Sequence, residues 1–317
     1  MNTENNARAV RFDQYGGRDV LYVADIPMPD PGPGEVLVQV RAAGINPGEA
    51  SIRSGAMHGR FPAAFPSGQG SDLAGVVTAL GAGATGFAPG DHVLGYSWTR
   101  SSHATHTAVP AIQLIRKPAA LSWAVAGSLY VAGCTAWAAV EAVGPEPGET
   151  VAVSAAAGGV GSIVVQLLAL RGARVLGIAS PANAPWLTAH GATPVPYGDP
   201  QQLAADLTAA APDGIDAFID LFGPEYLRLA ADLGIAPDRT ETIISFEKAA
   251  QLGAKSAGSM EASTPEVLTA LADHIAAGRI DIPIAATYPL DHVRDAYAEL
   301  EQRHTRGKIV LIPGADS

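Results

Sequence analysis

The chain has 317 residues, a length that suggests about two domains and allows a substantial buried core. Hydrophobic residues make up 48% of it and charged residues only 16%, which excludes a disordered chain and indicates a folded protein. With 20 Lys and Arg against 31 Asp and Glu the net charge is −11, and we therefore expect neither a nucleic-acid partner nor a membrane partner.

Cys134 is the only cysteine, so the chain can form neither an internal disulfide nor a cysteine-cluster metal site. The first ten residues lack a basic segment followed by an apolar stretch, which predicts a cytoplasmic protein without a secretory signal. Two stretches, Leu121–Val140 and Val151–Leu170, carry no charged residue and are long enough to cross a membrane. Because small residues and glycine clusters interrupt both, we expect them to be buried elements of a soluble protein.

The segment from Ala7 to about Pro118 is predicted to be β-rich, because short strand-like runs alternate there with Pro and Gly. The strands predicted in it include Val36–Val40, Leu73–Leu80 and His92–Leu94. We find no long helical period before Ser122, so this part of the chain predicts a β module of its own.

From Ser122 onward helical and strand-like stretches alternate, which is typical of a parallel sheet covered by helices. The predicted strands are Thr150–Ser154, Ala173–Ala179, Thr193–Tyr197, Ile215–Asp220 and Thr240–Ser245. The predicted helices are Ser162–Arg171, Ala184–His190, Gln201–Ala210, Tyr226–Leu233 and Pro265–Ala277. The fold class is therefore α/β, with a doubly wound parallel sheet in a domain of residues 121–284.

The tail of the chain returns to strand character at Lys308–Ile312, after a helix predicted near Leu290–Glu301. We therefore expect a discontinuous β-rich domain, formed by residues 1–120 and 285–317 together.

A glycine-rich turn follows the predicted strand at Thr150–Ser154 and precedes an apolar helix. Glycines at such a turn let a pyrophosphate approach the backbone, where free N–H groups and the helix dipole stabilise its charge. Gly158 and Gly161 match the second and third glycines of the G-x-G-x-x-G pattern, and Ala156 stands at the first. The pattern predicts a dinucleotide site, with a turn that serves only close helix–sheet packing as the alternative.

The residue after the next predicted strand indicates which dinucleotide binds. An Asp or Glu there would bond the adenosine ribose 2′-hydroxyl and repel a 2′-phosphate, but this chain has Ser180. The missing carboxylate favours NADPH over NADH, with Ser180 and Asn183 as donors to the phosphate. Both residue types also serve as helix N-caps, which is the alternative interpretation.

Seven segments along the chain resemble the zinc-independent quinone oxidoreductases, relatives of ζ-crystallin in the medium-chain dehydrogenase/reductase superfamily. The segments are 31–38 (PGPGEVLV), 43–47 (AGINP), 70–77 (GSDLAGVV), 90–93 (GDHV), 132–137 (AGCTAW), 157–161 (AGGVG) and 306–310 (RGKIV). The resemblance implies a GroES-like catalytic domain, a Rossmann domain, NADPH as cofactor and a homodimer.

The zinc alcohol dehydrogenases of the same superfamily are the nearest alternative. They carry a catalytic Cys near the position of Asn46 and a His-Glu pair where this chain has Ser71 and Asp72. Neutral Asn and Ser side chains cannot replace a thiolate and an imidazole as zinc ligands. His103 and His106 lie close together, but no third ligand is signalled nearby, so we expect no metal site.

The resemblance also implies a set of residues that bind the cofactor. They are Thr135 near the nicotinamide, Gly158, Gly159 and Val160 at the pyrophosphate, Ser180, Asn183 and Tyr197 at the 2′-phosphate and adenosine, Phe222 and Gly223 after the fourth strand, Ile244, Ser245 and Phe246 beside the nicotinamide, and the basic pair Arg306 and Lys308. Lys308 has an alternative interpretation as a solvated lysine at a strand start. Ala182 departs from the family, because many relatives have Arg there, and this lowers the expected preference for NADPH.

For such an enzyme we expect hydride transfer from C4 of NADPH to a quinone or to the β-carbon of an α,β-unsaturated carbonyl. Asn46 is the first candidate for a polar contact with substrate or nicotinamide ribose, unless it only caps the Asn-Pro turn. Ser51 and His103 are candidates for proton delivery, each at a position where relatives have Tyr. A surface strand position explains His103 equally well, and water can also supply the proton.

The role of Arg53 and two alternative functions of the protein remain open at this point. Arg53 binds an anionic substrate group or, more commonly, pairs with a local carboxylate. An enoyl-thioester reductase is a second possible enzyme, although no basic cluster marks a site for the phosphates of coenzyme A. A non-catalytic NADPH-binding protein is the third possibility, since Ser51 replaces the tyrosine of some relatives.

Overall fold

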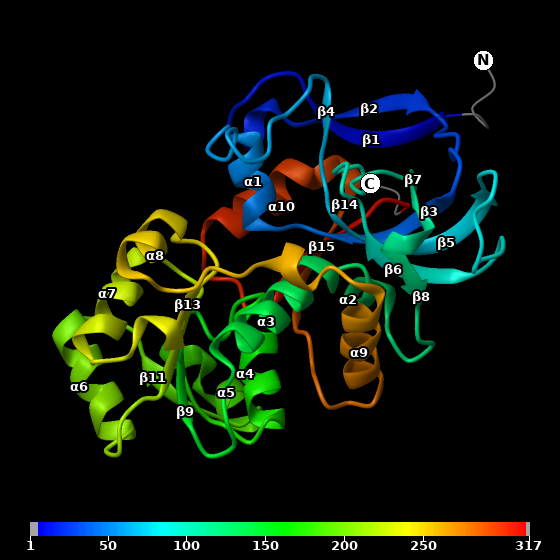
Figure 1. Cartoon of the computed structure of the whole chain (residues 1–317). Coiled ribbons are helices and arrows are strands. Elements are labelled where there is room, and N and C mark those ends of the chain that lie inside the picture. Colours follow the sequence, from blue (N-terminus) through cyan, green and yellow to red (C-terminus); the bar gives the residue numbers. More distant parts are fainter. Residues whose placement is uncertain (1–5, 315–317) are drawn as a thin grey trace. The chain divides into compact units, whose positions relative to one another are not determined.

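The structure, a computed structural model, describes residues 6–314, and the chain divides into two units (Figure 1). The first unit contains the described residues up to Val131, together with Thr264–Ala276 and the described residues from Ile284 onward. The second unit contains Ala132–Ser263 and Ala277–Pro283. Each unit is therefore built from more than one segment of the chain.

The first unit consists mainly of antiparallel sheets. Its strands are β1 (Asn6–Phe12), β2 (Tyr22–Pro27), β3 (Glu35–Gly44), β4 (Ser67–Gly68), β5 (Asp72–Leu80), β6 (His92–Tyr96), β7 (His106–Pro110), β8 (Leu114–Arg116), β14 (Ile284–Pro289) and β15 (Lys308–Ile312). A three-stranded sheet has the order β2-β1-β4, and a seven-stranded sheet has the order β14-β15-β3-β5-β6-β8 with β7 also paired to β3. The predicted strands at Val36–Val40, Leu73–Leu80 and His92–Leu94 are confirmed as parts of β3, β5 and β6.

Central position in the sheet explains why β3 is long and buried. It pairs with β5 along one edge and with β7 and β15 along the other, and most of its residues are buried. Val36 and Val38 on one face are fully buried and pack with Leu73 and Val77 of β5. Burying these branched side chains supplies much of the core of the first unit.

The helices of the first unit are α1 (Pro47–Arg53), α2 (Trp123–Ala126), α9 (Pro265–Ala276) and α10 (Val293–Glu301). The sequence analysis predicted neither α1 nor the edge strand β14. Pro47 occupies the first turn of α1, where its missing N–H costs nothing. Tyr297 of α10 is fully buried in a second core with Phe12 and Ile45.

The second unit is built on a five-stranded parallel sheet with the order β11-β10-β9-β12-β13. Its strands are β9 (Thr150–Val153), β10 (Arg174–Ala179), β11 (Ala192–Pro196), β12 (Ala217–Asp220) and β13 (Thr240–Thr242). Its helices are α3 (Tyr130–Val143), α4 (Gly161–Leu170), α5 (Ala184–Ala189), α6 (Pro200–Ala210), α7 (Pro224–Asp232) and α8 (Phe246–Leu252). This arrangement confirms the predicted α/β class with a doubly wound parallel sheet.

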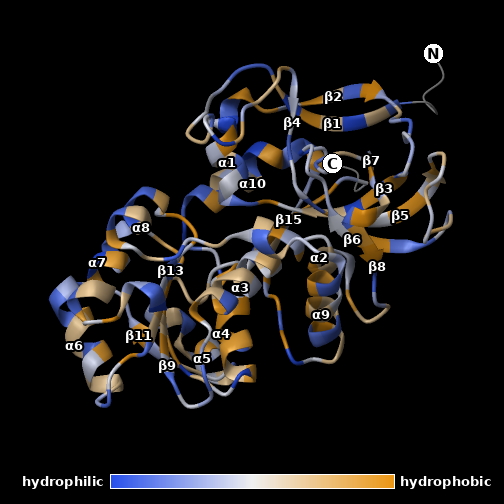
Figure 2. Ribbon diagram, in the orientation of Figure 1, coloured by the Kyte–Doolittle hydropathy of each residue, from blue (hydrophilic) through white to orange (hydrophobic). Residues whose placement is uncertain are grey.

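Helices cover both faces of this sheet. Figure 1 shows α6 and α7 on one side of it and α4 on the other. Leu207 of α6 packs with Phe218 and Ile178 of the sheet, and Ile163 of α4 is fully buried. The uncharged stretch Val151–Leu170 thus forms β9, a turn and α4, a helix coloured mostly as hydrophobic in Figure 2. Within residues 6–314 no helix is long and apolar enough to span a membrane.

Two differences from the predicted boundaries have local causes. The predicted strand Thr240–Ser245 ends at Thr242, because the N–H groups of Ile244 and Ser245 donate to Thr242 Oγ1 and leave the sheet. The first unit reaches Val131, beyond the expected boundary at residue 120, and it includes α9. The contacts of α2 with β3 and β5, and of α9 with β8, account for this grouping.

Candidate active site

The turn between β9 and α4 has the close packing that a dinucleotide turn requires. A Cβ atom added to Gly161 would lie 2.2 Å from the carbonyl oxygen of Ala155, so only glycine fits there. Ala155 itself has a left-handed backbone, with φ of 47°. The N–H groups of Ser162 and Ile163 at the start of α4 donate to Gly158 O and Val160 O, so a bound anion would contact the N–H groups of the turn before the helix. The turn thus supports the interpretation of Gly158, Gly159 and Val160 as a pyrophosphate site.

Ala156 explains how the motif tolerates the loss of its first glycine. Its methyl group is fully buried and faces Gly177 of β10, where an added Cβ would come within 3.2 Å of it. The Ala156 methyl group therefore fits between the turn and β10 because Gly177 has no side chain.

Ser180, Asn183 and Tyr197 lie together at the carboxyl ends of β10 and β11. Asn183 Nδ2 donates to Ser180 Oγ at 3.0 Å, and neither side chain caps a helix N-terminus. Ser180 and Asn183 do occupy the N-cap positions of the 3-10 turn Pro181–Asn183 and of α5, but without the capping hydrogen bond that the alternative interpretation implies. The N–H of Tyr197 donates to Ala179 O at 3.2 Å, and its side chain is 48% exposed.

The carboxyl ends of β12 and β13 present apolar side chains to solvent. Phe222, Ile244 and Phe246 are all large and between 37% and 41% exposed, although most side chains of their kind are buried. Ser245 differs from them, because it is 9% exposed and its Oγ has no hydrogen-bond partner within the described residues. Thr135 is buried on α3, at 7% exposure.

Asp220 connects these strand ends, and the sequence analysis did not single it out. Its Oδ1 accepts from Ser154 Oγ at 2.9 Å and from the N–H groups of Phe222 and Gly223 at 2.9 and 3.1 Å. Its Oδ2 accepts from Thr242 Oγ1 at 2.8 Å. Burial raises the pKa of Asp220, and these hydrogen bonds lower it. The sequence signal that could have identified Asp220 is a carboxylate at the last position of an otherwise apolar strand.

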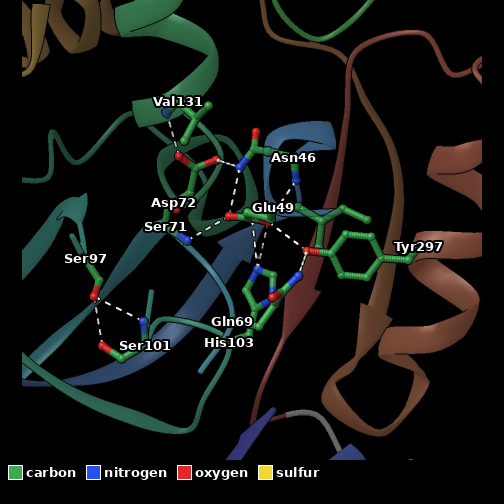
Figure 3. A network of polar contacts seen from close by, with 12 residues as sticks. Asn46, Glu49, Gln69, Ser71, Asp72, Ser97, Ser101, His103, Val131 and Tyr297 are labelled. Atoms are coloured by element: carbon green, nitrogen blue, oxygen red, sulfur yellow. Dashed lines mark hydrogen bonds and ion pairs between the residues drawn. The ribbon is translucent and has the colours of Figure 1, made fainter. Parts of the chain in front are cut away.

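A buried polar network in the first unit surrounds Asn46, the residue that precedes α1 (Figure 3). Asn46 Nδ2 donates to Glu49 Oε1 at 3.3 Å and to Asp72 Oδ2 at 3.1 Å. Its Oδ1 accepts a short hydrogen bond from Lys308 Nζ. The amide is therefore fixed by two carboxylates and one ammonium, and its role is more than a cap of the Asn-Pro turn. We call Asn46, Glu49, Asp72, Tyr297 and Lys308 the Asn46 network.

Glu49 receives donors from three directions (Figure 3). Its oxygens accept from the N–H of Asn46 at 3.0 Å, the N–H of Ser71 at 2.8 Å and Tyr297 Oη at 2.8 Å. Gln69 Nε2 in turn donates to Tyr297 Oη at 2.9 Å. Burial and the nearby Glu49 raise the pKa of Tyr297 well above its usual value, so this phenol stays a hydrogen-bond donor.

Asp72 and Lys308 form a buried ion pair, with Lys308 Nζ 3.4 Å from Asp72 Oδ2. Asp72 is fully buried and Lys308 is 4% exposed, so the interpretation of Lys308 as a solvated lysine is wrong. Lys308 Nζ also donates to Ile45 O at 3.3 Å. Burial raises the pKa of Asp72 and the Lys308 ammonium lowers it. Asp72 further accepts from the N–H of Val131 at 2.6 Å.

The proposed proton donors lie in different surroundings. His103 is fully buried, which makes its interpretation as a surface residue wrong. Its Nε2 lies 3.1 Å from Gly44 O and 3.8 Å from Glu49 Oε2. Ser51 lies on α1 outside the network and donates to Pro47 O at 3.2 Å.

Two basic residues of the first unit also lie apart from Asn46. Arg53 bonds Glu301 at 3.1 Å and stacks on the Tyr297 ring at 4.6 Å, which confirms its pairing with a local carboxylate. Arg306 is exposed.

Comparisons with known proteins identify the family of the chain. Residues 32–129 match the model of the alcohol dehydrogenase GroES-like domain, and residues 190–311 match the model of the zinc-binding dehydrogenase. A quinone oxidoreductase of Rattus norvegicus is 30% identical over 224 residues, which are 69% of this chain and 68% of that protein. The chain belongs to the quinone oxidoreductase family of the medium-chain dehydrogenase/reductase superfamily.

Other quinone oxidoreductases match over nearly the whole chain. The protein of Pseudomonas aeruginosa is 29% identical, over 97% of this chain and 100% of that one. The structure of the quinone oxidoreductase from Coxiella burnetii superposes with a TM-score of 0.85 at 28% identity, over 97% of this chain and 99% of that chain. The chain is thus an oxidoreductase of a superfamily that uses nicotinamide cofactors.

In this quinone oxidoreductase family member the predicted cofactor residues fall into two groups. The strand ends of the second unit carry most of them, and Asn46, Arg306 and Lys308 belong to the first unit. Sequence analysis missed Glu49, Asp72 and Tyr297, whose burial depends on contacts with distant residues. In the described range 6–314, no group of three or more His, Cys, Asp or Glu side chains could hold a metal ion.

Proposed function

We propose that the chain is a zinc-independent, NADPH-dependent reductase that acts on a quinone or on the C=C bond of an α,β-unsaturated carbonyl. The observation that carries this proposal is the carboxyl edge of the parallel sheet in the second unit. There the phosphate turn, the polar residues Ser180 and Asn183 and the exposed apolar side chains occur on neighbouring strands. Ligands of open α/β sheets bind at this edge.

The residues of the edge suit the parts of NADPH. In the proposal, the N–H groups of Gly159 and Val160 bind the pyrophosphate, and Ser180 and Asn183 bind the 2′-phosphate. Their hydroxyl and amide groups place no negative charge near the phosphate, which is why NADPH is preferred to NADH. Phe222, Ile244 and Phe246 supply apolar surface that excludes water beside the nicotinamide.

When bound, NADPH supplies a hydride from its C4 position and leaves as NADP⁺, while the reduced acceptor takes up a proton. Asn46 contributes a fixed acceptor, because both hydrogens of its amide already point to Glu49 and Asp72. The remaining lone pair of its Oδ1 suits a ribose or substrate hydroxyl. Water is the proton source in this proposal, because His103 is fully buried.

The proposal is tested by NADPH consumption with purified, metal-stripped protein. Quinones, enones and enoyl thioesters serve as acceptors, and the product masses are recorded. We expect a gain of two hydrogens on a quinone or enone and no requirement for added zinc. Turnover only with enoyl thioesters would support the enoyl-thioester reductase instead. NADPH binding without consumption of any acceptor would favour the non-catalytic alternative and contradict the proposal.

We also propose that the protein is a homodimer, as the family resemblance implies. Light scattering after size-exclusion chromatography measures the mass in solution. A mass of one chain at micromolar concentration would contradict this part of the proposal.

A further inference from the structure

Three neighbouring strands of the second unit end in polar side chains that contact one another. Ser154 follows β9, Asp220 ends β12 and Thr242 ends β13, and all three are fully buried. Asp220 accepts from both hydroxyls, at 2.9 Å from Ser154 and 2.8 Å from Thr242. We call these three residues the Asp220 network.

Each member of the network also holds the backbone of a turn. Asp220 accepts from the N–H groups of Phe222 and Gly223, as described above. Ser154 Oγ accepts from the N–H of Leu221 at 2.8 Å. The backbone of the turn after β12 is therefore fixed by side chains of two strands.

Thr242 does the same for the turn after β13. Its Oγ1 accepts from the N–H groups of Ile244 and Ser245 at 3.3 and 3.2 Å, while its hydroxyl hydrogen is donated to Asp220. The Thr242 hydroxyl can orient in this way only because Asp220 offers an acceptor on the other side. Asp220 thus acts on the turn at Ile244 and Ser245 through Thr242.

A ligand is indicated beside this turn by the hydroxyl of Ser245. The residue is 9% exposed, and its Oγ has no partner in the described part of the chain. Buried polar atoms without partners are rare in native proteins and call for a specific reason. A group of bound cofactor would satisfy this hydroxyl.

We propose that Asp220 is a positioning residue of the cofactor site, which sets the turns after β12 and β13 in the conformation that receives NADPH. This inference rests on the proposed function. Burying a carboxylate without a cation is costly, and the chain compensates this one with four neutral donors, two of which are N–H groups of the turn after β12. Asp220 acts through Phe222, Gly223 and Thr242 and has no part in hydride transfer.

The most specific test replaces Thr242 by Val, which keeps the shape of the side chain and removes the hydroxyl. Thr240→Val is the matched control, because Thr240 lies on the same strand, is 4% exposed and donates to Ala236 O at 3.1 Å. Thr240→Val loses one hydrogen bond and Thr242→Val loses three, but only Thr242 belongs to the Asp220 network. A role in stability alone would lower the melting temperature of both variants and leave the Kd of NADPH unchanged in both.

The readouts are the Kd of NADPH by fluorescence titration, the melting temperature, and kcat and KM. We expect Thr242→Val to raise the Kd and the KM for NADPH about tenfold, the equivalent of about one hydrogen bond. Thr240→Val should change both by less than about twofold. At saturating NADPH the kcat of both variants should stay near the wild-type value, since the network holds no reacting atom.

Asp220→Asn and Asp220→Ala complete the test. The amide oxygen of Asn can still accept from the N–H groups of Phe222 and Gly223, so this variant should retain more NADPH affinity than Asp220→Ala. Hydrogen exchange of the protein without cofactor gives an independent readout. In Thr242→Val, exchange should become faster in residues 243–246, and in Thr240→Val it should not.

The outcomes separate the two proposals. Wild-type protein that binds no NADPH would overturn the proposed function and the positioning role together. Wild-type protein that binds NADPH, with equal affinities in Thr242→Val and Thr240→Val, would overturn the positioning role alone. If Thr242→Val fails to fold, Ser154→Ala serves as the second variant, with the same expectation of weaker NADPH binding.

Discussion

The two units of the chain each bury an aspartate completely, and they compensate its charge in different ways. Asp72 in the first unit pairs with the Lys308 ammonium and with the amide of Asn46. Asp220 in the second unit has neutral donors, namely two hydroxyls and two backbone N–H groups. Burial raises the pKa of both carboxyls, and the hydrogen bonds and ion pairs around each one offset part of the cost of burying its charge.

The difference shows what each carboxylate determines. The partners of Asp72 are mainly side chains, so its network fixes the orientation of Asn46. Two partners of Asp220 are N–H groups of the turn after β12, and a third, Thr242, accepts from the turn after β13, so its network fixes backbone that is proposed to contact the cofactor. A buried charge thus orders side chains in one unit and loops in the other.

The largest loss of stability is expected for Lys308→Met. Removing the ammonium leaves Asp72 buried without a cation, which costs about 3–5 kcal/mol for a buried pair. The free energy of unfolding is measured by urea denaturation. The double variant Lys308→Met with Asp72→Asn should recover much of the loss, because it also removes the buried charge. Arg306→Met, at an exposed position, is the control and should change stability by less than about 0.5 kcal/mol.

A loss below about 1 kcal/mol in Lys308→Met would show that Lys308 does not compensate Asp72.

A pH effect of about 4 kcal/mol between pH 5 and pH 8.5 is expected from Glu241 on β13. Burial raises the pKa of Glu241 to about 8 from its usual 4.5, while the N–H of Ala257 donates to its Oε1. The folded chain therefore keeps this proton up to about pH 8, and the unfolded chain loses it above about pH 4.5. The stabilisation is complete below the unfolded pKa and is lost as the pH rises through the folded pKa.

Glu241→Gln tests this sign, because glutamine does not titrate and can still accept from Ala257. The free energy of unfolding of the wild type, relative to that of Glu241→Gln, should decrease from pH 5 to pH 8.5. Urea denaturation at a series of pH values measures the difference. Parallel curves for the two proteins would mean that Glu241 is already ionised when folded.

A smaller loss, of about 2 kcal/mol, is expected for Gly161→Ala in the turn of the second unit. The added methyl would lie 2.2 Å from Ala155 O, so the turn must shift. Gly198→Ala is the control, because an added Cβ there meets nothing within 4 Å. Urea denaturation measures the free energy of unfolding of both variants. Equal values for Gly161→Ala and Gly198→Ala would contradict the close packing of the turn.

The smallest effect is expected for Ser180→Asp, which changes cofactor preference. A carboxylate at this position should repel the 2′-phosphate and accept from the ribose hydroxyls of NADH. We expect the ratio of NADPH to NADH affinities to fall about tenfold, or about 1.4 kcal/mol. The Kd values of both cofactors measure it. An unchanged ratio would place the 2′-phosphate elsewhere.

The sequence predicted the parallel sheet because its strands are short apolar runs separated by helices with glycine caps. It predicted neither the seven-residue helices α1 and α8 nor the longer α3. It also gave no indication that Lys308 and His103 are buried. Their burial depends on Asn46, Asp72 and Gly44, which lie far away in the sequence, and local patterns contain no such information.

The most direct test of the account is a titration of NADPH into three proteins: the wild type, Gly158→Asp and Gly314→Asp. Gly314 is an exposed glycine where an added Cβ meets nothing within 4 Å, so this variant controls for the added charge. We predict that the wild type and Gly314→Asp bind NADPH alike, and that Gly158→Asp binds it at least about a hundredfold more weakly, because its carboxylate opposes the pyrophosphate. Equal binding by all three proteins would contradict the assignment of the cofactor site to the turn between β9 and α4.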